Sequence, residues 1–176
     1  PEARIAGEGG DRGGEGRVFV PRDSAALSVG ADDVAVAIAD EAKKRGLKLD
    51  LVRTGSRGLL WLEPLVEVET PTGRIAYGPV QPEDVANLFD AYFLSGAKHA
   101  LSHGVTDDIP YLKRQERLTF ARIGVIDPVS IADFTAHGGY EGLKKALEMK
   151  PLEIVTAVTD SGLRGLKTEL VEPRNA

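Results

Sequence analysis

Residues 47–77, LKLDLVRTGSRGLLWLEPLVEVETPTGRIAY, decide the expected fold. The first five residues alternate leucine with a charged residue, which predicts a half-buried strand. Further alternating strands are predicted over residues 64–70 and 74–77, and the Pro-Thr-Gly sequence at 71–73 predicts a hairpin turn between them. This stretch therefore predicts one strand followed by an antiparallel hairpin.

A strand and a helix are expected before this stretch, and a second helix after it. Residues 18–20, Val-Phe-Val, predict a short strand that Pro21 ends. Asp32 or Asp33 is expected to cap a helix that runs to about Arg45. The apolar face of that helix is expected to be Val34, Ile38 and Ala42, at helical spacing.

The second helix is predicted between Pro82 and Gly96, with Tyr92 among its apolar residues. The resulting β-α-β-β-β-α order covers residues 18–96. A β-α-β start requires a parallel crossover, and the hairpin adds antiparallel strands. We therefore predict an α/β fold, a thioredoxin-like domain with a mixed sheet.

The rest of the chain is divided by composition. Residues 1–17 are rich in glycine and charge and are expected to be a disordered tail. Residues 97–126 are predicted to be an irregular connector, and residues 127–165 a small helical segment. In that segment Asp127 is expected to cap a helix with Pro128 in its first turn, and residue 151 opens the last helix. Residues 166–176 stay unassigned.

Composition excludes several classes of protein. A net charge of −5 argues against a nucleic-acid binder. The sequence contains no run of 18 apolar residues, so no membrane span is predicted. The chain has no cysteine, which excludes disulfides, thiolate catalysis and cysteine-ligated clusters, and is compatible with the cytoplasm. It begins with Pro1, so we expect a processed chain or a fragment of a longer one.

Ser56-Arg-Gly58-Leu-Leu60-Trp-Leu-Glu-Pro64 and the later YGPVQPEDV at 77–85 resemble the thioredoxin-like two-iron two-sulfur ferredoxin domain of the NADH-dehydrogenase family. That family places cluster cysteines at C-x-G-x-C-x-x-x-P and in an earlier C-x4-C pair. The resemblance maps these slots to Ser56 and Leu60, and to Pro21 and Ala26 or the residues one position later, which are not cysteine either. None of the four is cysteine, so a ferredoxin-type domain without a cluster and without a metal site is expected.

Two later stretches extend the resemblance to the diaphorase subunits of that family. Residues 109–144 contain a Q-x-R, a G-x-I-D-P and a GGY motif in the order typical of the segment before the flavin site. Residues 161–165, SGLRG, look like the lead-in to the flavin mononucleotide (FMN) loop, so Arg164 and Gly165 would begin a truncated cofactor-binding loop. FMN, NAD and a four-iron cluster are expected in the family's following region, and none within this stretch.

The VPRDS sequence at 20–24 looks particularly like the β (diaphorase) subunit of soluble, cytoplasmic NAD-dependent formate dehydrogenases, which is related to the flavoprotein subunit of respiratory complex I. The resemblance implies a non-catalytic docking or scaffold module. Its partners would be a molybdenum or tungsten catalytic subunit and a ferredoxin-like subunit. The alternatives are the equivalent subunit of an NAD-reducing hydrogenase or of complex I, and a free-standing thioredoxin-like binding module.

Other features have a functional and a structural interpretation. Residues Leu59, Leu60, Trp61 and Leu62 would either fill the volume of the missing cluster or form a partner interface. Arg53 and Arg57 are interpreted as parts of a plain loop, with anion binding as the alternative. His99 and His103 have metal-ligand spacing but no third ligand, so they are interpreted as polar loop residues. Asp23 is expected to cap the end of the preceding strand.

Overall fold

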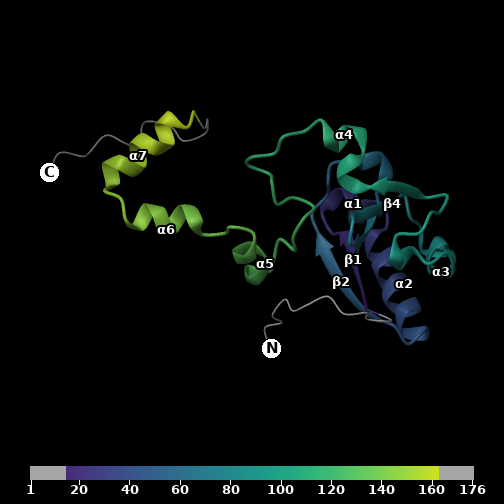
Figure 1. Ribbon diagram of the computed structural model, residues 1–176. Coiled ribbons are helices and arrows are strands. Elements are labelled where there is room, and N and C mark those ends of the chain that lie inside the picture. Colours follow the sequence, from purple (N-terminus) through teal and green to yellow (C-terminus); the bar gives the residue numbers. More distant parts are fainter. Residues whose placement is uncertain (1–14, 163–176) are drawn as a thin grey trace. The chain divides into compact units, whose positions relative to one another are not determined.

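The computed structural model describes residues 15–162, which belong to two compact units that divide after Asp133. Figure 1 shows the first unit as a sheet with helices packed against it. No helix of the described stretch is long and apolar enough to cross a membrane. The expected flavin-loop residues Arg164 and Gly165 lie outside the described residues, as do the tail from 166 and most of the N-terminal tail.

The first unit is built on a five-stranded mixed sheet with the order β2-β1-β3-β4-β5. β1 is parallel to β2, and the other neighbours are antiparallel. The first four strands follow the predicted β-α-β-β-β-α order, and the arrangement is thioredoxin-like, which confirms the predicted fold class. The strands are β1 (Glu15–Pro21), β2 (Lys48–Thr54), β3 (Val66–Thr70), β4 (Gly73–Tyr77) and β5 (Ser102–Val105).

Helices cover one face of this sheet. α2 (Ala31–Lys44) and α3 (Val85–Asp90) pack onto it together with the short α1 (Ser24–Ser28). The predicted apolar face of α2 is buried: Val34, Ile38 and Ala42 lie in the main core. The inward residues of the strands complete that core, and they alternate with residues that point to the opposite face.

The opposite face is covered by loops. A second apolar cluster there consists of Leu59, Leu62, Leu65, Ala76 and Leu112. Leu112 belongs to α4 (Pro110–Lys113), a single turn within the segment predicted as an irregular connector. β5 also lies in that segment, so the prediction of an irregular stretch is wrong for these residues. A short strand forms there because the free edge of β4 supplies its hydrogen bonds.

Three further boundaries differ from prediction. β1 begins at Glu15, because its first residues pair with the start of β2, so the expected tail is too long at residues 15–17. Gly30, at a positive φ of 95°, caps α2, and Asp32 and Asp33 lie in its first turn. The single helix expected over 82–96 is interrupted at Tyr92, which has a φ of 58° and is exposed rather than buried.

The second unit is helical. α5 (Ile131–Ala136) spans the division between the units, and α6 (Glu141–Leu147) and α7 (Pro151–Asp160) follow. α7 begins at its proline as predicted, and the Glu153 carboxylate accepts a hydrogen bond from the Lys150 N–H at 2.7 Å. α5 begins after the predicted Pro128, because the Asp127 carboxylate accepts from the Val129 N–H in a local turn instead.

Candidate functional site

The four positions expected to correspond to cluster ligands are occupied by residues with other structural roles. Pro21 ends β1 and is buried, and Ala26 is fully buried in α1. The Ser56 hydroxyl donates to Glu63 Oε1 at 2.7 Å and accepts from the Gly58 N–H at 2.9 Å. The fourth position, Leu60, is exposed. An iron–sulfur cluster needs four soft ligands, so these residues do not fit one.

Glu63 is the buried acceptor that closes this loop. Its second carboxylate oxygen accepts from the Leu65 N–H at 2.9 Å. Burial raises the pKa of Glu63, although the hydrogen bonds from Ser56 and Leu65 oppose the shift. The loop over 56–65 is therefore held by hydrogen bonds around one buried carboxyl group. Within residues 15–162, no group of three or more histidines and carboxylates is placed to hold a metal ion.

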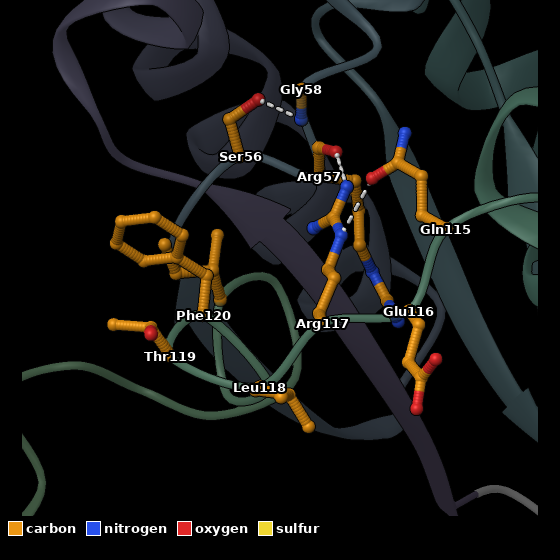
Figure 2. Close-up of a pocket in the computed structure, with 10 residues that line it drawn as sticks. Ser56, Arg57, Gly58, Gln115, Glu116, Arg117, Leu118, Thr119 and Phe120 are labelled. Carbon is orange, nitrogen blue, oxygen red and sulfur yellow. Dashed lines mark hydrogen bonds between the residues drawn. The ribbon is translucent and has the colours of Figure 1, made fainter. Parts of the chain in front are cut away.

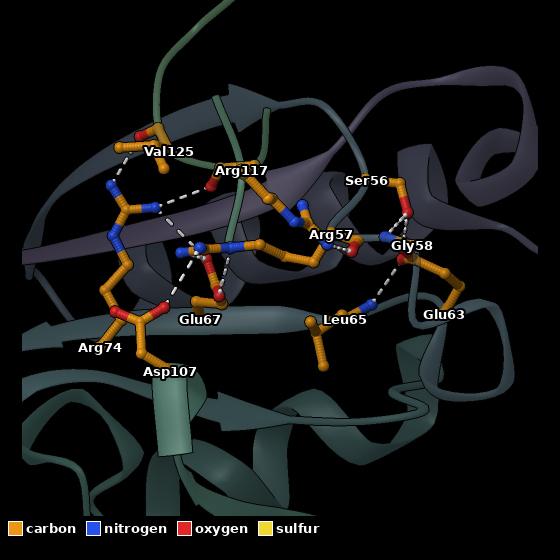
Figure 3. A network of polar contacts seen from close by, with 11 residues as sticks. Ser56, Arg57, Gly58, Glu63, Leu65, Glu67, Arg74, Asp107, Arg117 and Val125 are labelled. Atoms are coloured by element: carbon orange, nitrogen blue, oxygen red, sulfur yellow. Dashed lines mark hydrogen bonds and ion pairs between the residues drawn. The ribbon is translucent and has the colours of Figure 1, made fainter. Parts of the chain in front are cut away.

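A cluster of buried charges lies beside the loop (Figure 3). Glu67 of β3 is 3% exposed and lies between two guanidinium groups. Arg57 Nε is 3.1 Å from Glu67 Oε1, and Arg74 Nη1 is 3.3 Å from Glu67 Oε2. Arg57 Nη1 also lies 3.4 Å from the exposed carboxylate of Asp107. We call Arg57, Glu67 and Arg74 the arginine clamp.

The clamp attaches the connector to the sheet. Arg74 donates to the carbonyl oxygens of Gly124 at 2.9 Å and Val125 at 2.6 Å. Its guanidinium carbon lies 3.3 Å from the centroid of the Phe19 ring, a cation–π contact. Burial lowers the pKa of Arg74, and the adjacent Glu67 charge opposes that shift.

An open pocket of about 540 Å³ lies between two parts of the chain, the turn over residues 56–58 and the segment after α4 over residues 115–123 (Figure 2). Arg117 Nη2 donates to the Arg57 carbonyl oxygen at 2.7 Å, and Arg117 Nε donates to Gln115 Oε1 at 2.9 Å. Apolar side chains form the other side of the pocket. They are Leu118, Phe120 and Ile123, all exposed.

The predicted apolar patch is divided between interior and surface. Leu59 and Leu62 are buried in the second apolar cluster, so they cannot contact a partner, which corrects that expectation for these two residues. Leu60 and Trp61 are 61% and 59% exposed and stay interface candidates. The Trp61 ring lies edge-on to the exposed Tyr111 ring, with 5.1 Å between centroids. The structure therefore divides this stretch into two packed side chains and two exposed ones.

The two arginines considered for anion binding are both paired with carboxylates. Arg53 donates to Asp32 Oδ1 at 2.7 Å and to the carbonyls of β1, and Arg57 belongs to the clamp. Both guanidiniums are thus paired within the fold, and Arg53 lies in β2 rather than in the predicted loop.

The side chains of His99, His103 and Asp23 each form hydrogen bonds with other residues of the first unit. His99 Nε2 lies 2.7 Å from the Asn87 side-chain oxygen, while His103 Nε2 lies 2.7 Å from the Gly78 carbonyl oxygen. The two histidines thus serve different contacts. Asp23 Oδ1 accepts from the N–H groups of Ala25 and Ala26, so the cap predicted after the strand stabilises the start of α1, a short helix that was not predicted.

Sequence reasoning missed Glu67 and Arg74, and it noted Arg117 only as part of the Q-x-R motif. The available signal was the alternation of β3, which places Glu67 on the same face as buried Leu65. A charged residue at such a position requires buried partners, and the two arginines supply them from seven and ten residues away.

Comparisons with known proteins give partial sequence matches and a set of structural matches. No family model matches the chain. Over 53 residues, 30% of the chain, the sequence is 53% identical to the NADP-reducing hydrogenase subunit HndC of Solidesulfovibrio fructosivorans. The match spans only 11% of that relative's length.

Solved structures of a thioredoxin-like 2Fe-2S ferredoxin from Aquifex aeolicus are also similar. The wild-type ferredoxin has 22% sequence identity and a TM-score of 0.43, over 52% of this chain and 99% of the ferredoxin. A variant with one cysteine changed to serine has 25% identity and a TM-score of 0.43, over 51% of this chain and 98% of the other. The fold assignment rests on the strand order described above.

Proposed function

We propose that the chain is a docking module in the diaphorase subunit of an NAD(P)-linked oxidoreductase complex. One observation carries this proposal: the four positions that correspond to cluster ligands hold other residues, and each of these has another structural role. Ser56 closes a loop through Glu63, Leu60 faces solvent, and Pro21 and Ala26 are buried. A ferredoxin-type fold with these residues has no ligands for electron transfer, so its proposed contribution is a surface for other subunits.

The electron donor is the finer part of the proposal. The sequence resemblance favours formate, oxidised at a molybdenum or tungsten centre in another cytoplasmic subunit. The partial match to a hydrogenase subunit supports hydrogen as the alternative donor. FMN, NAD and the four-iron cluster would bind in the region after Gly165, with Arg164 and Gly165 at the start of the flavin loop. Residues 15–162 are not proposed to take part in catalysis.

The exposed Leu60, Trp61 and Tyr111 support a second candidate function, a free-standing binding module. Together they form a small apolar and aromatic surface, and such residues are enriched at the centres of protein interfaces. This candidate predicts partner binding without any flavin in the native chain.

A tagged form of the native protein, expressed in the organism that encodes it, tests both candidates. We expect it to copurify with flavin and with redox subunits, and to reduce NAD(P) with formate. Reduction with hydrogen instead would support the hydrogenase alternative. A chain that is isolated with partners but without flavin would support the free-standing module, and a chain without any redox partner would contradict the docking proposal.

Paired variants locate the docking surface. Leu60→Asp combined with Trp61→Asp is expected to release the partner subunits. Val36→Asp on α2 is the matched control, because Val36 is 60% exposed but belongs to the helical layer. If both variants retain the partner subunits equally, Leu60 and Trp61 do not form the docking surface. The docking proposal would then require a different surface of the chain.

A further inference from the structure

Arg117 carries a positive charge that no carboxylate balances within residues 15–162. Its two hydrogen-bond acceptors are a backbone carbonyl and an amide oxygen, both neutral. The neighbouring guanidiniums of Arg57 and Arg74 share Glu67, Arg57 also contacts Asp107, and the charge of Glu69 acts on Arg74. Among these three guanidiniums, the half-buried Arg117 is the one that forms no ion pair with a carboxylate of residues 15–162.

The guanidinium of Arg117 is fixed in orientation but still has donors to offer. A guanidinium has five N–H groups, and the two hydrogen bonds use only Nε and one hydrogen on Nη2. No hydrogen bond with another residue of the described range 15–162 uses the Nη1 group or the second hydrogen on Nη2. Figure 2 shows the third nitrogen directed towards the side of the pocket where Phe120 lies. The edge with Nη1 and Nη2 has the geometry that binds a carboxylate through two parallel hydrogen bonds.

The rest of the pocket is suited to an apolar group. Leu118, Phe120 and Ile123 line it and are 84%, 63% and 40% exposed, which is unusual for large apolar side chains so close together. Glu116 also lines the pocket, but in Figure 2 its carboxylate points away from the Arg117 guanidinium. A single unbalanced cation beside an apolar wall complements a monoanion with an apolar neighbour.

From this charge complementarity we propose that the Arg117 pocket binds a peptide segment of a partner subunit in which a carboxylate adjoins an apolar side chain. The carboxylate would take the free edge of Arg117, and the apolar side chain would pack on Phe120 and Ile123. A phosphate group is a poorer match, because a dianion would meet only one unbalanced cation here. This inference rests on the proposed docking function and names the chemistry of the partner.

Titration of the full 176-residue chain, followed by NMR of backbone amide and arginine Nε signals, tests the site directly. N-acetyl-leucine is the probe, because it joins a carboxylate to an apolar side chain, and N-acetyl-leucinamide is the uncharged comparison. We expect the acid to shift the Gly58, Arg117 and Thr119 signals saturably. We expect the amide to bind about tenfold or more weakly, as the loss of a charge-assisted hydrogen bond implies. Inorganic phosphate at equal ionic strength is expected to bind more weakly than the acid.

Matched arginine variants assign the binding to one residue. Arg117→Gln is expected to weaken binding of the acid about tenfold or more. Arg114→Gln should bind like the wild type, because Arg114 lies three residues away, outside the pocket, and donates to the Pro110 carbonyl. If Arg117→Gln does not fold, Phe120→Ser removes the apolar wall without touching the clamp and should also weaken binding.

Equal binding of acid and amide, equal affinity in the two arginine variants, or preferential binding of phosphate would each overturn the proposal. These outcomes are independent of copurification with redox subunits, so the site can fail while the docking function holds. If instead the native protein is isolated without partners although the titration succeeds, the docking function fails and the carboxylate pocket stands.

Discussion

Glu67→Gln provides the sharpest test of how this fold is held together. The substitution keeps the size of the side chain but removes the charge that Arg57 and Arg74 share. Glu67 is 3% exposed, and the arginine side chains are 11% and 16% exposed, so water cannot replace the lost carboxylate. Removing one partner from a buried ion pair typically costs about 3–5 kcal/mol, because the remaining charge is left uncompensated. We expect the free energy of unfolding to fall by about that amount.

The matched control is Asp50→Asn on the same face of the sheet. Asp50 Oδ2 lies 3.0 Å from Arg17 Nε, as close as the atoms of the clamp, but the two side chains are 61% and 39% exposed. An exposed pair contributes about 0–1 kcal/mol, because water solvates both charges after the contact is lost. The two variants therefore separate the effect of burial from the effect of distance.

Urea unfolding, followed by circular dichroism and by the fluorescence of Trp61, the single tryptophan, measures both variants. We also expect amide hydrogen exchange to accelerate around Gly124 and Val125 in Glu67→Gln, because Arg74 anchors their carbonyls. A loss in Glu67→Gln that lies within about 1 kcal/mol of the loss in Asp50→Asn would refute the reasoning, because the clamp would then behave as a surface pair.

Three further substitutions test the loop over residues 56–65. Burial raises the pKa of Glu63, so the folded chain holds this proton more strongly than the unfolded chain, whose ordinary value is 4.5. The resulting stabilisation is complete below pH 4.5 and is lost as the pH rises through the folded value. We expect urea unfolding at a series of pH values to show this decline in the wild type but not in Glu63→Gln, and parallel curves would contradict the assignment. Leu59→Ala should cost about 2–5 kcal/mol, because Leu59 is fully buried, whereas Leu60→Ala should stay within about 0.5 kcal/mol. Thermal or urea unfolding of this pair checks it, and similar losses in the two variants would show that the loop is placed incorrectly.

The sequence predicted the parts of the fold that local patterns determine. Alternation located β2, β3 and β4, and helical spacing located the buried face of α2. Both patterns work because burial on one face imposes a period of two on strands and about 3.6 on helices. The Asp23 cap was equally local, since its acceptor and donors lie within three residues.

The missed features depend on contacts between residues far apart in the chain. β5 contains Ser-His-Gly-Val, which shows no alternation of apolar residues, and it forms because β4 offers a free edge. The burial of Glu67 depends on two arginines outside its own strand. Tyr92 has a positive φ within a pattern that was typical of a continuous helix, and no local signal marks it.

The apolar patch at 59–62 shows why composition alone left two alternatives open. Leu60–Leu62 form one turn of 3₁₀-helix, in which residues three apart lie on the same side. Leu59 and Leu62 therefore both enter the second apolar cluster, while Leu60 and Trp61 both face outward. The geometry of this single turn separates packing residues from interface candidates, and four adjacent letters cannot show that turn.

Different interactions on the loop-covered face of the sheet have different roles. Leu59 and Leu62 bury apolar surface, which supplies free energy in proportion to area but specifies little about orientation. The arginine clamp adds little net free energy compared with apolar residues of the same size, yet its hydrogen bonds to Gly124 and Val125 define where the connector lies. Because Arg117 is fixed by the backbone of Arg57, the clamp also sets the position of the unbalanced charge. Loosening the clamp with Glu67→Gln should therefore weaken carboxylate binding at Arg117, although Glu67 itself does not line that pocket.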